Sequence, residues 1–164
     1  MALILEDGTA LPNSNTYVLE ATFSAWLISM GYTITKPAEE LLLNAMVTIE
    51  VQKYKGSKLT KAQLLQWPRS GVVVDGFDID EDEIPAQLIN AQMQCAYDID
   101  QGNNPSAIGT QAIKSTKSKV DVIEKEIQYQ DNTSSSNYNV ALYGYLSKLL
   151  ANGSGMGIAA VICS

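Results

Sequence analysis

The chain has 164 residues, with 11 basic and 18 acidic side chains and a net charge of −7 at pH 7. It contains no histidine, which excludes histidine-dependent catalytic triads, imidazole general bases and zinc sites. Its two cysteines, Cys95 and Cys163, lie far apart, so the sequence has no cysteine cluster for metal or redox chemistry. A hydrophobic content of 46% is sufficient for one packed domain, whereas the acidic balance disfavours a dedicated duplex-DNA binder.

The N-terminal residues, Met1 to Asp7, lack the basic stretch of a signal peptide. No apolar run approaches the roughly 18–20 residues that a membrane-spanning helix needs. We therefore expect a protein that is made and kept in a reducing cytoplasm, with two free thiols and no membrane partner.

The first half of the chain alternates turn-rich stretches with hydrophobic residues at helical spacing. Glycines close the first two helical patterns, and the third pattern stops before Pro68, as expected for the residue that precedes a proline. In chain order, the sequence predicts an ordered loop over 6–16, helices over 19–30, 37–54 and 60–66, and a short β-like run at 72–74.

The second half begins with a third long helical pattern, for which Asp82 is a good N-cap and Pro85 suits the first turn. The hydrophobic period then changes to the alternation of two antiparallel strands. The predicted elements are a helix over 82–101, a hairpin over 111–129 turning near 120–124, a flexible linker over 131–139, a helix over 138–151, and an apolar tail over 153–164 with a strand at 158–162. The fold class is therefore mainly α (α+β): one domain over 1–164 with four to five helices, a β-hairpin and a C-terminal strand.

The densest charge lies in residues 75–83, which account for six of the seven units of net negative charge. A calcium loop of the EF-hand type needs a carboxylate at its twelfth position, where this sequence has Ala86. We therefore predict no metal site, and expect a solvated loop that faces a protein partner or repels DNA phosphates. The acidic residues are Asp75, Asp78, Asp80, Glu81, Asp82 and Glu83.

Lysines form two groups, one after the second predicted helix and one on the hairpin. With Tyr54 and Tyr129 they suggest a groove for single-stranded DNA, in which charge holds the backbone and aromatic rings stack on bases. A plain solvated surface is the alternative, and it agrees better with the negative net charge. The first group is Lys53, Lys55, Lys58 and Lys61, and the second is Lys114, Lys117 and Lys119.

No serine, glycine-rich loop or carboxylate pair has the spacing of a catalytic or phosphate-binding motif. The sequence therefore predicts neither an enzyme nor a cofactor, and a small acidic enzyme is the weakest of the alternatives.

The segment Trp67-Pro68-Arg69-Ser70-Gly71 is the most specific motif, and its tryptophan is typical of a core or interface anchor. Together with further segments, this motif resembles a family of small proteins encoded by tailed bacteriophages, the head–tail adaptors or head-completion proteins. The likeness covers about residues 6–130. The further segments are Glu6-Asp-Gly-Thr9, Asn15-Thr-Tyr17, Gly56-Ser-Lys58, and Asp78-Ile-Asp80 leading into Asp82-Glu-Ile-Pro85.

The resemblance implies a homo-oligomeric ring, expected to be a dodecamer, that joins the portal protein to tail or stopper proteins in the virion neck. DNA would pass through the ring only in transit, and the subunits would assemble in the host cytoplasm. On this interpretation the acidic residues 75–83 line the lumen or contact a neighbour. The apolar tail, with Ile158, Val161 and Ile162, would add as a strand to an adjacent subunit or to the portal.

One segment departs from the family. In the family, the hairpin usually turns at a glycine, whereas this chain has Lys119-Val-Asp-Val-Ile123 there. The sequence therefore does not fix the register of the hairpin. Members of the family also carry the label "putative DnaT-like single-stranded DNA-binding protein", which the charge of this sequence does not favour. The sequence therefore predicts a structural head–tail adaptor, with a single-stranded DNA-binding accessory protein of phage replication as the alternative.

Overall fold

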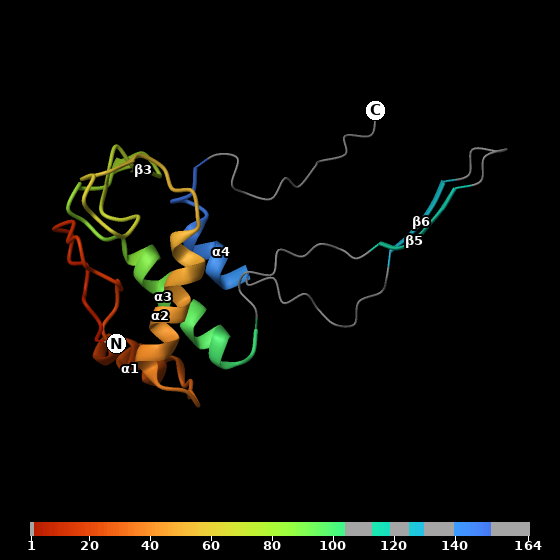
Figure 1. The fold of residues 1–164 in the computed structure, drawn as a ribbon, viewed down its shortest axis with the longest axis horizontal. Coiled ribbons are helices and arrows are strands. Elements are labelled where there is room, and N and C mark those ends of the chain that lie inside the picture. Colours follow the sequence, from red (N-terminus) through yellow and green to blue (C-terminus); the bar gives the residue numbers. More distant parts are fainter. Residues whose placement is uncertain (1, 104–112, 119–124, 130–139, 152–164) are drawn as a thin grey trace.

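The computed structural model describes residues 2–103, 113–118, 125–129 and 140–151. This part of the chain contains four helices and three small two-stranded antiparallel sheets, which confirms the predicted helix-rich α+β class (Figure 1). In chain order the elements are α1 (Glu20–Met30), α2 (Ala38–Glu50), β1 (Ser57–Lys58), β2 (Arg69–Ser70), β3 (Val73–Val74), β4 (Phe77–Asp78), α3 (Ala86–Asp100), β5 (Ile113–Ser118), β6 (Lys125–Tyr129) and α4 (Val140–Leu146).

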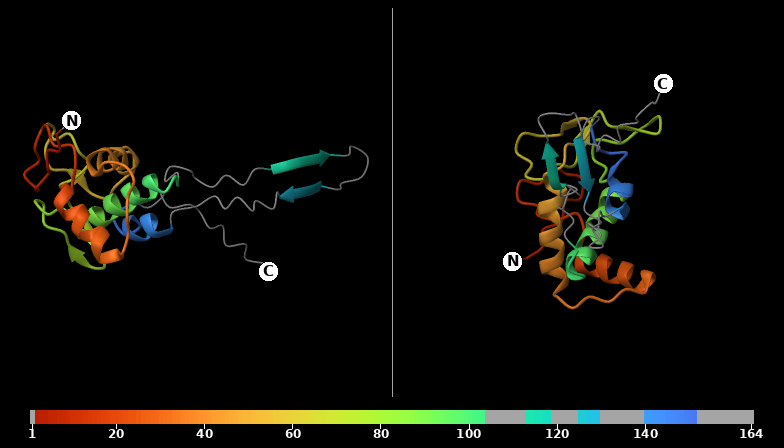
Figure 2. Two further views of the ribbon diagram at one scale, coloured as in Figure 1. Left: turned by 90° about the horizontal axis from the view of Figure 1, so that it is seen from below. Right: turned by 90° about the vertical axis from the view of Figure 1, so that its right-hand side faces the viewer.

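All four helices contribute side chains to the core. Helix α3 packs along α2 on one side and against α4 on the other, and α1 packs across α2 (Figures 1 and 2). The apolar stripes predicted for the second and third helices are buried in this core. Their fully buried members include Leu42, Ala45 and Ile49 of α2 and Leu88, Ala91 and Cys95 of α3. None of the helices described is long and apolar enough to cross a membrane.

A buried glutamine joins the N-terminal loop to this helical core. The Gln92 side chain accepts the N–H of Tyr17 at 3.0 Å and donates to the Thr16 hydroxyl at 2.8 Å and to the Leu42 carbonyl at 3.1 Å. Both the oxygen and the nitrogen of the side-chain amide therefore have hydrogen-bond partners, as a fully buried polar group requires.

The loop predicted over residues 6–16 is ordered around one buried carboxylate. Glu6 accepts the N–H groups of Gly8, Ala10 and Leu11 at 2.9–3.1 Å and the hydroxyl of Ser14 at 2.8 Å. Four donors converging on a buried carboxylate fix the path of a segment that has almost no regular structure.

One predicted helix is absent, and the predicted bounds of three others are wrong. Helix α2 ends at Glu50 and not near residue 54. No helix forms over 60–66, because Thr60 and Gln63 bond each other's backbone N–H through their side chains, and the Gln63 amide also donates to the carbonyls of Leu65 and Pro68. Such side-chain bonds offer the backbone an alternative to helical bonds.

Asp82 does not cap α3 either, because that helix begins at Ala86 after Pro85, which occupies the N-cap position. The last helix is shorter than its predicted span of 138–151.

The strands β5 and β6 form the predicted hairpin, with Ile113 opposite Tyr129 and Ser118 opposite Lys125. The predicted turn at 120–124, the linker at 131–139 and the tail at 153–164 lie outside the described residues.

A close approach at Gly8 yields a stability prediction. This glycine has a φ of +102°, and a Cβ at its position would collide with the backbone carbonyl of Asp82. We expect Gly8→Ala to lower the free energy of unfolding by about 3 kcal/mol, since backbone strain of about 1–2 kcal/mol is joined by the clash. Urea denaturation measures this loss.

Gly102→Ala is the matched control for Gly8→Ala. Gly102 has a φ of +76° and open space around its Cβ position, so this substitution adds the backbone strain without the clash. Equal losses in the two variants would show that the contact between the N-terminal loop and residue 82 does not contribute.

Candidate functional site

The Trp-Pro-Arg motif lies inside the fold. Trp67 is completely buried, its ring meets that of Tyr54 edge-on with centroids 6.0 Å apart, and its peptide bond to Pro68 is cis. The motif therefore presents no aromatic face to solvent, and its role in this structure is packing.

Arg69, the last residue of the motif, is only 8% exposed and holds the backbone of the preceding loop. Its Nε donates to the carbonyl of Lys55 at 2.6 Å, and its two terminal nitrogens donate to the carbonyls of Gly56 at 2.8 Å and Gln66 at 3.1 Å. One of them also donates to the side-chain oxygen of Gln66 at 3.1 Å. The rigid fork of a guanidinium suits this task, because it supplies several donors in fixed directions.

A second buried network lies beside the motif. The Tyr17 hydroxyl donates to one carboxylate oxygen of Glu50 at 2.6 Å and accepts the N–H of Trp67 at 3.1 Å. The other carboxylate oxygen of Glu50 accepts the N–H of Gln66 at 2.7 Å. Burial raises the pKa of Glu50, although these hydrogen bonds and the charges of Lys58 and Arg69 oppose the rise. Burial and the neighbouring Glu50 also raise the pKa of Tyr17.

Five lysines lie on two neighbouring segments of the chain: residues 53–61, which include the loop that Arg69 holds, and the residues after α4 that pair with it. We call Lys53, Lys55, Lys58, Lys61 and Lys148 the lysine surface. All five side chains are exposed or partly exposed.

The segment after α4 brings Lys148 into the lysine surface. Leu150 pairs with Tyr54 in an antiparallel bridge, supported by backbone bonds from Ala151 to Lys53 and from Lys55 to Leu149, both 2.9 Å long. The ammonium group of Lys55 donates to the carbonyl of Lys148 at 2.7 Å. The sequence analysis missed Lys148, since residues 93 positions apart give no spacing pattern that would connect them.

The groove predicted from the lysines and two tyrosines is wrong for Tyr54. Tyr54 is buried and its hydroxyl donates to the carbonyl of Ile49 at 3.0 Å, so it offers no ring for base stacking. Lys114 and Lys117 lie on β5 and Tyr129 on β6, while Lys119 lies outside the described residues. What remains of the predicted groove near the end of α2 is its positive charge.

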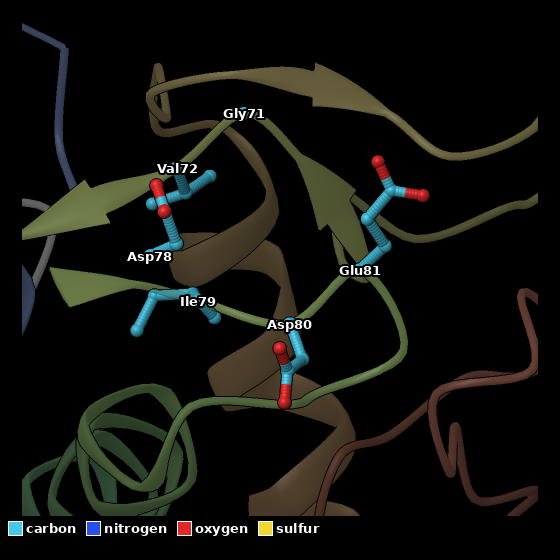
Figure 3. A pocket seen from close by; sticks show the side chains of 6 residues that line it. All are labelled: Gly71, Val72, Asp78, Ile79, Asp80 and Glu81. Atoms are coloured by element: carbon cyan, nitrogen blue, oxygen red, sulfur yellow. The ribbon is translucent and has the colours of Figure 1, made fainter.

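The six predicted acidic residues are all exposed. Asp78, Asp80 and Glu81 lie around a shallow hollow of about 310 Å³, together with Gly71, Val72 and Ile79. Figure 3 shows that the three carboxylates stand at separate points of the rim and do not converge. Within the described part of the chain, no three acidic or cysteine side chains group closely enough to hold a metal ion.

Asp75 differs from its acidic neighbours because it forms an ion pair. Its Oδ2 lies 2.6 Å from Nζ of Lys148. This contact joins the acidic segment directly to the lysine surface.

Other sequence-derived candidates lie elsewhere. Ile158, Val161 and Ile162 of the predicted assembly tail are outside the described residues. Cys95 is buried, and burial raises the pKa of its thiol to about 12, so it is not a reactive nucleophile.

Residues 1–162 match a family of proteins described as "Putative DnaT-like ssDNA binding protein". The chain belongs to this family. No curated protein and no solved structure matches the sequence. The match covers the lysine surface, the Trp-Pro-Arg motif and the acidic segment alike. The description of the DnaT-like family names single-stranded DNA and does not mention a head–tail adaptor.

In this DnaT-like chain, a lysine at position 69 would keep the positive charge but remove the planar guanidinium and its fixed donors. This substitution tests whether the loop depends on the geometry of those donors. We expect Arg69→Lys to lower the free energy of unfolding by about 2–3 kcal/mol, because three partly buried carbonyl groups lose their charged donor. Urea denaturation measures the loss, and amide hydrogen exchange at residues 55–58 reports on the loop itself. Unchanged stability and exchange would contradict the role assigned to the guanidinium.

The Glu50 network predicts a pH dependence. Since the folded-state pKa of Glu50 is raised above its usual value of 4.5, the folded protein holds this proton more tightly than the unfolded chain. The resulting stabilisation is complete below that usual value and is lost as pH rises through the folded-state pKa.

Urea denaturation from pH 4 to pH 7 checks this sign. The unfolding free energy of the wild type should fall relative to that of Glu50→Gln, which does not titrate, as pH increases. A difference that stays constant, or that grows in favour of the wild type, contradicts the raised pKa.

Proposed function

We propose that the chain binds single-stranded DNA through the lysine surface, without catalysis and without a cofactor. The observation that carries this proposal is that residues 53–61 and Lys148, which backbone pairing places beside residues 53–55, carry five exposed or partly exposed lysines. The family of the chain is described as DnaT-like and single-stranded DNA-binding. Lysine ammonium groups bind phosphates as point charges, so binding here follows the DNA backbone and is independent of base sequence.

The negative net charge does not prevent such binding, because most of it is concentrated in residues 75–83, which form an ion pair with the lysine surface at Asp75 and Lys148. Six of the 18 acidic side chains lie in residues 75–83, and Glu50, the carboxylate beneath the lysine surface, is enclosed by its hydrogen bonds to Tyr17 and Gln66. A local positive surface on an acidic protein supports modest affinity and strong dependence on salt.

A head–tail adaptor is the second candidate function, and the exposed apolar side chains favour it. Ile28 on α1 is 80% exposed, Phe77 at the start of β4 is 76% exposed, and Val47 and Val51 at the end of α2 are similarly accessible. Helix α1 has a single charged residue, Glu20. Such surfaces suit a protein that works in an assembly.

In this second function the chain would form a homo-oligomeric ring between the portal and the tail or stopper proteins of a virion. Its localisation would be the virion neck. Electron microscopy of the purified protein tests this directly: closed rings support the adaptor function, and monomers that bind single-stranded DNA contradict it.

A salt titration of DNA binding tests the first proposal. We expect fluorescence anisotropy with labelled oligo(dT) to show binding at about 50 mM salt, with a slope of log Kobs against log[salt] of about −3.5 if all five lysines contact phosphates. Lys53→Gln should reduce the magnitude of this slope by about 0.7, since one phosphate contact is lost.

Lys36→Gln is the matched control, because it removes the same charge from the opposite end of α2. The 13 residues of that helix separate the two lysines by about 20 Å. Absence of binding at low salt, or equal effects of the two substitutions, contradicts the assignment of the lysine surface.

A further inference from the structure

The ion pair between Lys148 and Asp75 joins the lysine surface to the acidic segment, and its contribution to the stability of the fold does not account for it. Both side chains are more than half exposed, and an exposed pair of this kind contributes little to folding. Yet both partners are held in place by the backbone on either side of the contact.

Asp75 is positioned by a tight turn. The pairing of Val74 with Phe77 leaves Asp75 and Gly76 as a two-residue connection, and both have positive φ values, of 54° and 87°. Positive φ at both central positions is the geometry of a type I′ hairpin turn, which aspartate tolerates better than most residues. A backbone bond from Ile79 to Val72, 2.9 Å long, extends the hairpin.

Lys148 is positioned by the end of α4. The N–H groups of Leu149 and Leu150 both bond the carbonyl of Leu146, and the next residues pair with the chain at 53–55. The backbone of Lys148 is therefore fixed beside Lys55, whose ammonium group donates to the Lys148 carbonyl, while the ammonium group of Lys148 lies against Asp75. It is the only member of the lysine surface for which the described residues show an ion pair.

We propose that Lys148 forms a phosphate-binding position of the lysine surface, and that Asp75 occupies this position in the free protein as an internal competitor. A carboxylate oxygen 2.6 Å from an ammonium nitrogen takes the place that a phosphodiester oxygen takes in the complex. Because the exposed pair is weak, the DNA backbone displaces Asp75 without disturbing the fold. The proposal rests on the proposed function and names the ligand of this position as a phosphodiester group of single-stranded DNA.

Removing the competitor should strengthen DNA binding. We expect Asp75→Asn to bind labelled oligo(dT) about two- to five-fold more tightly than the wild type, the range that corresponds to the strength of an exposed ion pair. Asp78→Asn is the matched control, since Asp78 is also exposed, lies three positions after Asp75 and takes no part in the ion pair. This substitution removes the same charge. It should increase affinity clearly less.

A double-mutant cycle separates the specific contact from a general effect of charge. In the background of Lys148→Gln, Asp75→Asn and Asp78→Asn should change affinity equally, because the lysine that Asp75 masks is absent. Circular dichroism verifies that each variant is folded. An equal effect of the two aspartate substitutions in the wild-type background, or an unchanged advantage of Asp75→Asn without Lys148, overturns the inference.

The two proposals fail in different ways. If the wild type and Asp75→Asn both show no salt-dependent binding, the proposed function fails and the inference fails with it. If the wild type binds through Lys53 but Asp75→Asn behaves like Asp78→Asn, only the inference fails.

Discussion

The guanidinium of Arg69 holds, from inside the fold, the backbone on which the lysine surface is built. It bonds the carbonyls of Lys55, Gly56 and Gln66, so the residues between α2 and β1 follow a fixed path although they form no regular element. Glu50 lies beneath the same loop and bonds both Tyr17 and Gln66. The guanidinium of the sole arginine of the chain therefore binds backbone carbonyls inside the protein, so only lysines are available to contact a phosphate at this surface.

This arrangement explains how an acidic protein presents a positive surface. The acidic residues 75–83 surround the β3–β4 hairpin, whereas the lysines follow the loop after α2 and the end of α4. The two regions meet at the contact between Asp75 and Lys148. If the protein binds single-stranded DNA, we expect this junction to tune its affinity. In an adaptor ring, the same segregation of charge and the exposed apolar residues of α1 would serve contacts between subunits.

Hydrophobic periodicity predicts the helices because it depends on neighbours three and four residues away, and the stripes of α2 and α3 are indeed buried. It fails where side chains compete for the backbone, as Thr60 and Gln63 do, and where a proline takes the N-cap position instead of Asp82. Only part of the lysine surface can be predicted from the sequence. Four lysines are close in sequence, but the burial of Tyr54 and the arrival of Lys148 depend on the pairing of residues 53–55 with 149–151.

We propose that DNA contacts the lysine surface and not another face of the protein. Chemical-shift mapping by NMR, with unlabelled oligo(dT) added to isotope-labelled protein at low salt, tests it most directly. We expect the changes in backbone amide shift to concentrate at residues 53–61 and 148–151 and to disappear when salt is raised. Shifts concentrated on α1 or on the acidic segment, or no shifts at all, would contradict it.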